Sequence, residues 1–248
     1  MISQKWSKLI RSLQQKKYRK AEQQFFVEGE KAVLELLAST WQVDAVFATE
    51  KFLQHYPQQL KAAALVQQCS ADELVKVGTF ASNDAALAVV KMPPHSDFVP
   101  HSHGFVLVLD QINDPGNLGT IIRIADWYGI KHIVCSPDTA DCYNPKVIAA
   151  AKGSFLRVQL HYQALQPLLA HSTVPVYGAY LGGESVHQLQ LSQAGGFIVL
   201  GNEANGISSD LEQVISRKIT IPAFGEAESL NVGIAAAVIC DNLLRLSQ

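Results

Sequence analysis

The chain has 248 residues, 48% of them hydrophobic, and a formal net charge of −2. This composition excludes wholesale disorder, because it supplies enough apolar surface for one large core or two modest ones. The near-neutral charge excludes a globally basic nucleic-acid-binding protein, but it leaves room for a local basic surface.

The start of the chain, MISQKWSKLIRSLQQ, lacks the apolar core of a signal peptide. No apolar run approaches the roughly 18 residues of a membrane-spanning helix. The four cysteines are scattered along the chain, at Cys69, Cys135, Cys142 and Cys240. None of them forms a CxxC pair, which is typical of reduced thiols. We therefore expect a soluble cytoplasmic protein.

The first part of the chain opens on a basic, Gln-rich segment and then alternates strand-like and helix-like runs. Strands are predicted at residues 25–29, 43–49, 64–69 and 85–92, and helices at 30–39 and 70–77. Ser70 and Glu73 have the spacing of a capping box at the start of the second helix. This alternation favours a small α/β sandwich.

A seam follows at KMPPHSDFVPHSHG, residues 91–104, which has the composition of a linker. We predict a first domain at residues 1–92, a linker at 93–104 and a second domain at 105–248. The histidines His101 and His103 are interpreted as exposed linker residues rather than as metal ligands, and no metal site is expected.

The second part alternates strands and helices throughout. Strands are predicted at residues 105–112, 132–135, 156–161, 174–181, 197–202 and 218–223. Helices are predicted at residues 117–129, 144–154, 208–216 and 231–246. The pattern predicts an α/β domain with a mostly parallel sheet and helices on both faces. Ligands of such sheets bind at the carboxyl ends of the strands.

Polar residues follow the first of these strands. Asp114-Pro115-Gly116 is interpreted as a tight turn, and Asn117 as the cap of a helix that carries Arg123. The structural alternative for Arg123 is a surface pair with Asp126.

Two later loops also carry polar residues at strand ends. In GNEANGIS, two glycines flank Glu203, which is either a solvated charge or a group aimed into the crevice. In ESLNVGIAAAVI, Ser229 is a candidate helix cap, whereas Asn231 opens a helix that is apolar almost all round. An unpaired buried amide costs about 1–3 kcal/mol, so Asn231 needs partners. The helix itself is expected to be buried or to pack on another subunit.

Common catalytic motifs are missing from the sequence. No dinucleotide fingerprint follows a strand, and there is neither a Walker A sequence nor a nucleophile elbow. Without a metal motif or a strong nucleophile, the remaining chemistry is a positioned transfer from a bound cofactor.

Three segments together carry a family pattern: NLGTIIR at 117–123, LGNEANGIS at 200–208 and IPAFGEAESLNV at 221–232. Residues 105–248 thereby resemble the SpoU (TrmH-like) family of RNA ribose 2′-O-methyltransferases, within the SPOUT superfamily. The segment KKYRKAEQQFFVEGEKAVLELL resembles the opening of the L30e-like substrate-binding domain found in such enzymes.

The resemblance implies a deep trefoil knot, a homodimer formed through the second domain, and S-adenosylmethionine as cofactor. The cofactor-binding residues that it implies are Leu200, Gly201, Asn202, Glu203, Gly206, Ile221, Pro222, Ser229 and Leu230. The catalytic residues that it implies are Asn117, Arg123, Glu203, Ser229 and Asn231. Arg123 would bind a phosphate and stabilise alkoxide charge, or act as a base, for which an always-protonated guanidinium is poorly suited.

The basic opening, interleaved with Trp6 and Tyr18, is a candidate RNA surface, with a solvated helix face as the alternative. The RNA-binding residues expected are Lys16, Lys17, Arg19, Lys20 and Arg123. By analogy with the family, ribosomal RNA is favoured over transfer RNA. A non-catalytic assembly factor and a small-molecule enzyme remain alternatives. Removal of residues 1–92 should abolish RNA modification but spare a small-molecule reaction.

Overall fold

The computed structural model describes residues 1–100, 104–191 and 195–247, so the His101-Ser102-His103 motif lies outside the described residues. The chain forms two compact units. The first unit contains Met1–Pro94 and Asp141–Leu156, and the second contains His95–Ala140 and Arg157–Gln248. The segment Asp141–Leu156 thus belongs to the first unit, although it follows the first strands of the second along the chain.

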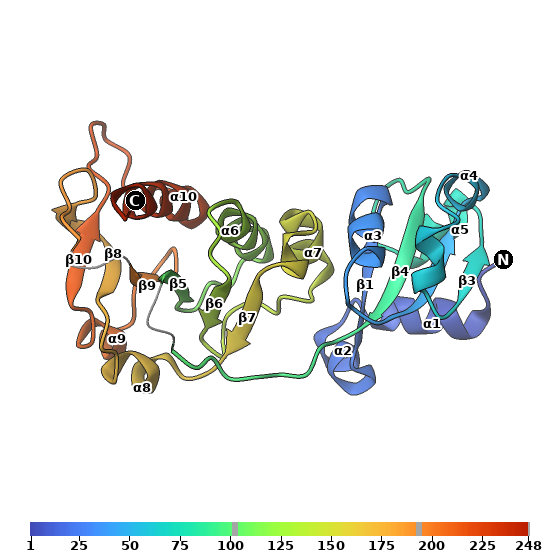
Figure 1. Ribbon diagram of the computed structural model, residues 1–248, viewed down its shortest axis with the longest axis horizontal. Helices are drawn as coiled ribbons and strands as arrows, with labels where there is room; N and C mark the ends of the chain where they lie inside the picture. The colour runs from blue at the N-terminus through green and yellow to red at the C-terminus, as the bar shows by residue number, and fades with distance from the viewer. Residues whose placement is uncertain (101–103, 192–194, 248) are drawn as a thin grey trace. The chain divides into compact units, whose positions relative to one another are not determined.

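The first unit contains a 4-stranded sheet of order β1-β4-β2-β3 (Figure 1). Its strands are β1 (Gln24–Glu28), β2 (Val43–Ala48), β3 (Val66–Gln68) and β4 (Ala86–Lys91). Strands β1 and β2 run antiparallel to β4, and β3 runs parallel to β2. All four strands were predicted from the sequence.

Helices surround this sheet and complete the first unit. They are α1 (Gln4–Ser12), α2 (Lys16–Glu22), α3 (Glu30–Leu37), α4 (Glu50–His55), η1 (Gln59–Ala62), α5 (Ala71–Val77), α7 (Pro145–Ala151) and η2 (Ser154–Leu156). The capping box of α5 is confirmed, since Ser70 and Glu73 bond each other's backbone N–H groups. Helix α4 was not predicted, and its start is marked by Thr49, whose side chain accepts from the N–H of Phe52.

Arg19 requires a correction, because it is buried rather than part of an exposed RNA surface. Only 1% of the residue is accessible to solvent. Its Nη1 donates to the carbonyls of Leu13 (2.8 Å) and Gln14 (2.9 Å), where α1 ends. Its Nε and Nη2 donate to Oδ2 of Asp141, at 3.0 and 2.6 Å. Arg19 therefore joins the turn between α1 and α2 to the segment that begins at Asp141.

The second unit contains an all-parallel 6-stranded sheet of order β10-β8-β9-β5-β6-β7. Its strands are β5 (Gly104–Leu109), β6 (His132–Cys135), β7 (Gln159–Tyr162), β8 (Val176–Ser185), β9 (Gly195–Leu200) and β10 (Arg217–Thr220). The predicted parallel sheet is confirmed. The central strand β9 is buried along its length, as expected for a strand covered on both faces.

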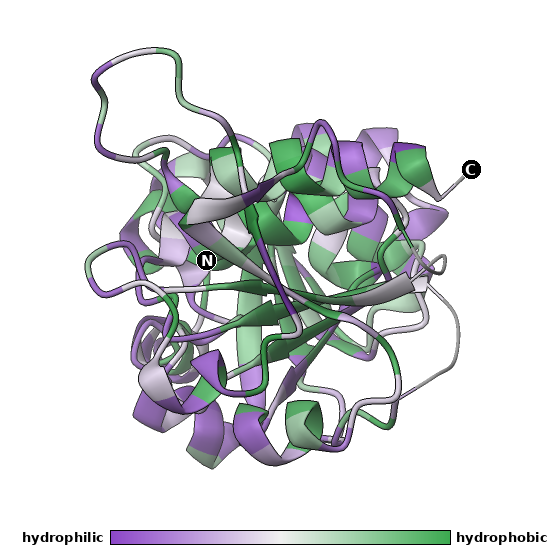
Figure 2. Cartoon of the chain, turned by 90° about the vertical axis from the view of Figure 1, so that its left-hand side faces the viewer, coloured by the Kyte–Doolittle hydropathy of each residue, from purple (hydrophilic) through white to green (hydrophobic). Residues whose placement is uncertain are grey.

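Helices cover both faces of this sheet (Figure 1, Figure 2). One face carries α6 (Pro115–Trp127) and α10 (Val232–Leu246), which pack against each other. The other carries α8 (Leu165–Ala170) and α9 (Ser209–Glu212), whose buried leucines join a core with Val108, Val134 and Val199. Among the described residues, no helix is long and apolar enough to cross a membrane.

Replacement of Arg19 by Met tests the buried ion pair. The change leaves the Asp141 carboxylate, which is 14% exposed, without its cation, and the Leu13 carbonyl without its donor. We expect the free energy of unfolding of the first unit to fall by about 3–5 kcal/mol, as for other broken buried pairs. Urea unfolding of the full chain measures this change. The exposed neighbour Lys20→Met is the control, and equal stability of the two variants would contradict the assignment.

Candidate functional site

The polar loops predicted from the sequence lie at the carboxyl edge of the second unit's sheet. Strands β5 and β9 are neighbours in register, with Leu109 opposite Leu200. The loops that follow them begin at Asp110 and Gly201, and the loop after β10 begins at Ile221. In open parallel sheets this edge is where ligands bind.

Helix α6 begins earlier than predicted, and its cap is a different residue. Asp114 is the N-cap, and its Oδ1 accepts from the N–H of Asn117 at 2.8 Å. Pro115 occupies the first helical position, where its fixed φ and missing N–H are tolerated. The predicted turn at 114–116 and the capping role of Asn117 were therefore wrong. Because Asp114 caps the helix, the Asn117 side chain is free for other contacts.

The cap of α10 also differs from the prediction. Asn231, not Ser229, is the N-cap, and its Oδ1 accepts from the N–H groups of Gly233 (2.9 Å) and Ile234 (3.4 Å). Gly233 is buried, and a Cβ there would lie 3.0 Å from Cγ2 of Thr120 in α6. Glycine at position 233 therefore lets α10 pack closely on α6. Ser229 is exposed and lies in the loop before the cap.

Two hydrogen bonds between side chains join the three loops. Oδ1 of Asn231 faces backbone N–H donors, so its Nδ2 points outward and donates to Oδ1 of Asn117 at 2.9 Å. Oδ1 of Asn117 is then an acceptor, and its Nδ2 donates to Oε1 of Glu203. The helix cap thus fixes the direction of both amides and, through them, the position of the Glu203 carboxylate.

The loop after β9 is shaped by its own backbone and by Asn202. Asn202 and Gly206 exchange N–H···O bonds of 3.0 and 2.8 Å, and a Cβ at Gly201 would lie 2.2 Å from the carbonyl carbon of Gly206. Only glycine fits at position 201 for this reason. Oδ1 of Asn202 accepts from the N–H of Ala204 at 2.9 Å. Both the backbone and the side chain of Asn202 therefore hold the turn.

Two supporting residues were missed by the sequence reasoning. Gln111 has a positive φ of 56°, and its carbonyl accepts from Nδ2 of Asn202 at 2.8 Å. Asp110 is buried, and its Oδ2 accepts from the N–H of Ser208 at 2.8 Å. The pair of polar residues directly after an apolar strand was the available signal, and it was read as part of the strand.

Arg123 lies on the exposed side of α6. The alternative surface pair with Asp126 does not form, because Asp126 accepts from Nη2 of Arg157 at 2.8 Å. In the part of the chain that the structure describes, the Arg123 side chain has no hydrogen bond or ion pair. Its guanidinium is therefore available to an anion from outside the chain.

The loop between β10 and α10 exposes backbone and apolar groups. Across the described residues, no backbone hydrogen bond involves residues 221–230. Leu230 is 49% exposed and Phe224 is 95% exposed. Unpaired backbone groups beside apolar side chains suit a ligand with both apolar surface and polar edges. Ile221, Pro222, Ser229 and Leu230, all expected at a cofactor site, lie in this loop.

Replacement of Asn231 by Asp separates capping from the contact with Asn117. The carboxylate still accepts from the N–H of Gly233, but it presents an oxygen to Oδ1 of Asn117, so the Asn117 amide must turn and release Glu203. We expect a thermal midpoint close to that of the unchanged chain and a shifted side-chain amide signal of Asn117 in NMR spectra. Asn231→Ala also loses the cap, which costs roughly 1 kcal/mol. An unmoved Asn117 signal in both variants would contradict the coupling.

Comparisons with known proteins support a family assignment for both units. Residues 104–241 match the model of the SpoU rRNA Methylase family, and residues 7–88 match the MRM3-like substrate binding domain. The 23S rRNA (guanosine(2553)-2′-O)-methyltransferase RlmP of Bacillus subtilis is 31% identical over 94% of this chain and 93% of its own length.

Solved structures agree with this match. A TrmH-family protein from Porphyromonas gingivalis is 35% identical, with a TM-score of 0.85 over 99% of both chains. An AdoMet-bound rRNA methyltransferase from Sinorhizobium meliloti, at 24% identity, shares the fold, with a TM-score of 0.87 over 99% of this chain and 97% of its own. Because both the family model and a full-length relative match, the chain belongs to the SpoU rRNA methylase family.

Proposed function

We propose that the protein transfers a methyl group from S-adenosylmethionine to a ribose 2′-hydroxyl of RNA, with ribosomal RNA favoured over transfer RNA. The observation that carries this proposal is the joining of Asn117, Glu203 and Asn231 by directed hydrogen bonds at the carboxyl edge of the sheet. The relative from B. subtilis, whose name specifies 23S rRNA, supports the choice of RNA.

The cofactor fits the loops that follow β9 and β10. S-adenosylmethionine, when bound, supplies an electrophilic methyl group. The free backbone groups of residues 221–230 would bond the polar edges of its adenine, and Leu230 would cover its apolar surface. Gly201 would offer its backbone groups from the facing loop, since a side chain at position 201 is sterically excluded, and Leu200 and Gly206 would line the same side of the cofactor site. Glu203 would hold a polar group of the cofactor or the ribose.

The residues on this edge would align the reaction and stabilise charge. A ribose hydroxyl is a weak nucleophile at neutral pH, so alignment and charge stabilisation must supply most of the rate. Arg123 would bind an RNA phosphate and stabilise the developing alkoxide, because a guanidinium stays protonated in proteins. Asn117 and Asn231 would hold the Glu203 carboxylate in place, and Ser229 would act in support.

We further propose a homodimer through α6 and α10 and a trefoil knot in the C-terminal segment. Trp127 of α6 is 84% exposed and Ile234 of α10 is 54% exposed, and large exposed apolar side chains mark association surfaces. Helices α6 and α10 pack against each other, so Trp127 and Ile234 lie on two adjoining helices. Sedimentation equilibrium of the chain should give twice the 27.1 kDa mass; a monomer at micromolar concentration would refute the dimer.

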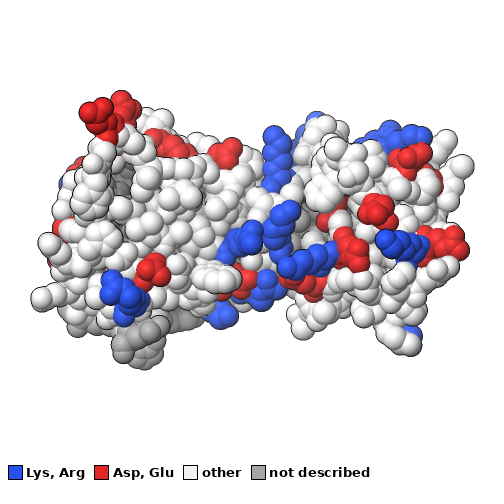
Figure 3. All heavy atoms as spheres, turned by 90° about the horizontal axis from the view of Figure 1, so that it is seen from above, with Lys and Arg blue, Asp and Glu red and all other residues white. Residues whose placement is uncertain are grey.

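The first unit is the proposed RNA-binding part. It holds 14 Lys and Arg residues against 10 Asp and Glu, whereas the second unit holds 6 against 12. On the face shown in Figure 3, basic and acidic side chains of the first unit (right) are interspersed. Lys16, Lys17 and Lys20 are exposed beside Tyr18, so they remain part of the proposed RNA surface. Arg19 is not part of it, because it is buried. We place the reaction in the cytoplasm, in keeping with four cysteines that form no disulfide.

Labelling with tritiated S-adenosylmethionine tests the function. The full chain is incubated separately with total ribosomal RNA and total transfer RNA, and nuclease digestion then identifies the labelled nucleotide. Label in ribosomal RNA on a ribose is the expected result. Label on a base would overturn the 2′-O assignment. Cofactor binding by calorimetry without label in either RNA would favour the alternative of an RNA-binding assembly factor.

Substitution of Arg123 tests its role in the transfer. If Arg123 supplies charge, Arg123→Lys should retain roughly a tenth or more of the rate, while Arg123→Ala should lose about a hundredfold or more. Single-turnover methyl transfer measures both variants, with cofactor affinity unchanged. Lys131→Ala, which removes an exposed charge from the same unit, is the control. Equal loss in the Lys and Ala variants would assign the rate to guanidinium geometry or to base chemistry.

A further inference from the structure

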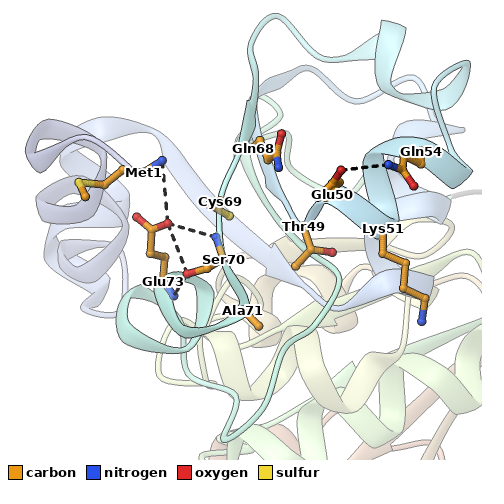
Figure 4. A pocket seen from close by; sticks show the side chains of 10 residues that line it. All are labelled: Met1, Thr49, Glu50, Lys51, Gln54, Gln68, Cys69, Ser70, Ala71 and Glu73. Atoms are coloured by element: carbon orange, nitrogen blue, oxygen red, sulfur yellow. Dashed lines mark hydrogen bonds and ion pairs between the residues drawn. The ribbon is translucent and has the colours of Figure 1, made fainter.

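A hollow of about 930 Å³ lies in the first unit, at the carboxyl ends of β2 and β3 (Figure 4). These strands are parallel neighbours, with Ala48 opposite Gln68. The loops that follow them, at Thr49 and Cys69, form the hollow together with the starts of α4 and α5. The geometry repeats, on a smaller sheet, the strand-end position at which parallel sheets bind ligands.

The carboxylates of the hollow are already engaged. Oε1 of Glu50 accepts from Nε2 of Gln54 at 3.1 Å. Glu73 accepts from the N–H groups of Ser70 (3.1 Å) and Ile2 (2.8 Å), and these bonds hold its pKa below the usual range. Both acids therefore serve the protein's own groups rather than an incoming cation.

Two side chains of the hollow are left for a ligand. The amide of Gln68 and the ammonium of Lys51 are exposed and, among the described residues, make no side-chain hydrogen bond or ion pair. Cys69 also lines the hollow, and it is neutral because burial raises the pKa of its thiol to about 11. An amide that both donates and accepts, together with an ammonium, matches a base edge joined to a phosphate.

A basic helix leads to the rim of the hollow. Helix α1 lies along α5, since Ile2 bonds Glu73 near the start of α5 and Nε of Arg11 donates to the carbonyl of Lys76 near its end. Lys5, Lys8 and Arg11 repeat every three residues and are exposed, so they share one face of α1. These basic side chains could contact successive phosphates of an RNA backbone along this face.

We propose that the hollow binds one unpaired nucleotide of the RNA substrate, with Gln68 at the base edge and Lys51 at a phosphate. This inference rests on the proposed action on RNA, but it assigns a separate site in the first unit. The first unit would then recognise unpaired nucleotides, because these are the nucleotides of a folded RNA whose base edges are accessible to proteins.

Binding of short RNAs to the full chain tests this site. The probes are a fluorescent single-stranded RNA of mixed sequence and a duplex RNA of equal length, measured by anisotropy at one fixed salt concentration. Gln68→Leu and Lys51→Gln should each weaken single-strand binding by roughly tenfold and leave duplex binding within about twofold. The matched controls Gln58→Leu and Lys61→Gln, exposed in the same unit outside the hollow, should change neither.

Three results would overturn the site. They are unchanged single-strand binding in the hollow variants, equal loss of single-strand and duplex binding, and no single-strand binding by the unchanged chain. Competition by mixed nucleoside monophosphates as strong as that by RNA would instead reveal a free-nucleotide site. Cofactor binding and RNA labelling are measured on the same variants. Methylation of RNA by a chain whose hollow does not bind RNA would overturn only this site. Binding of RNA in the hollow without methylation would overturn only the proposed function.

Discussion

The direction of the two hydrogen bonds from Asn231 through Asn117 to Glu203 is the constraint on which the candidate site depends. Each bond is partly open to solvent, so its net contribution to stability is only about 0.5–1.5 kcal/mol. Its effect is on orientation. A helix N-terminus can only donate, so the oxygen of Asn231 must face α10 and its nitrogen must face Asn117. Asp at either Asn position would break this order, although at position 231 it would cap the helix equally well.

This constraint explains why the residues that hold the Glu203 carboxylate are amides rather than charged groups. Asn117 sits at the third position of α6, where its own helix needs nothing from its side chain because Asp114 provides the cap. Gly233 lets α10 approach α6 closely enough for the two helix starts to share a contact. The packing of α6 on α10 and the placement of Glu203 are thus parts of one arrangement, and the apolar surface of the two helices supports a polar site at their ends.

The fold was largely predictable because its strands are apolar runs bounded by turn residues, as at residues 105–109 and 197–200. The family motifs also predicted that Asn117, Glu203 and Asn231 lie at the same edge of the sheet. The sequence could not tell which residue caps a helix, since Asp114 and Asn117, like Ser229 and Asn231, all have the right chemistry. It also could not reveal the burial of Arg19, because its partner Asp141 is 122 residues away. Whether Ser229 and the cofactor residues act as expected remains a prediction.

The first unit depends on Asp141–Leu156 as much as on its own N-terminal sequence. Phe25 of β1 lies 4.7 Å from Tyr143 between ring centroids, Trp41 lies 6.0 Å from Phe155, and Val147 is fully buried. A fragment beginning at residue 93 would carry the apolar side chains of Tyr143, Val147 and Phe155 without the sheet that covers them. Loss of RNA modification after removal of residues 1–92 would therefore not show that RNA binding resides there, because exposed apolar surface and an uncompensated Asp141 would follow from the same cut. Point substitutions in the full chain avoid this ambiguity, since they leave both units covered.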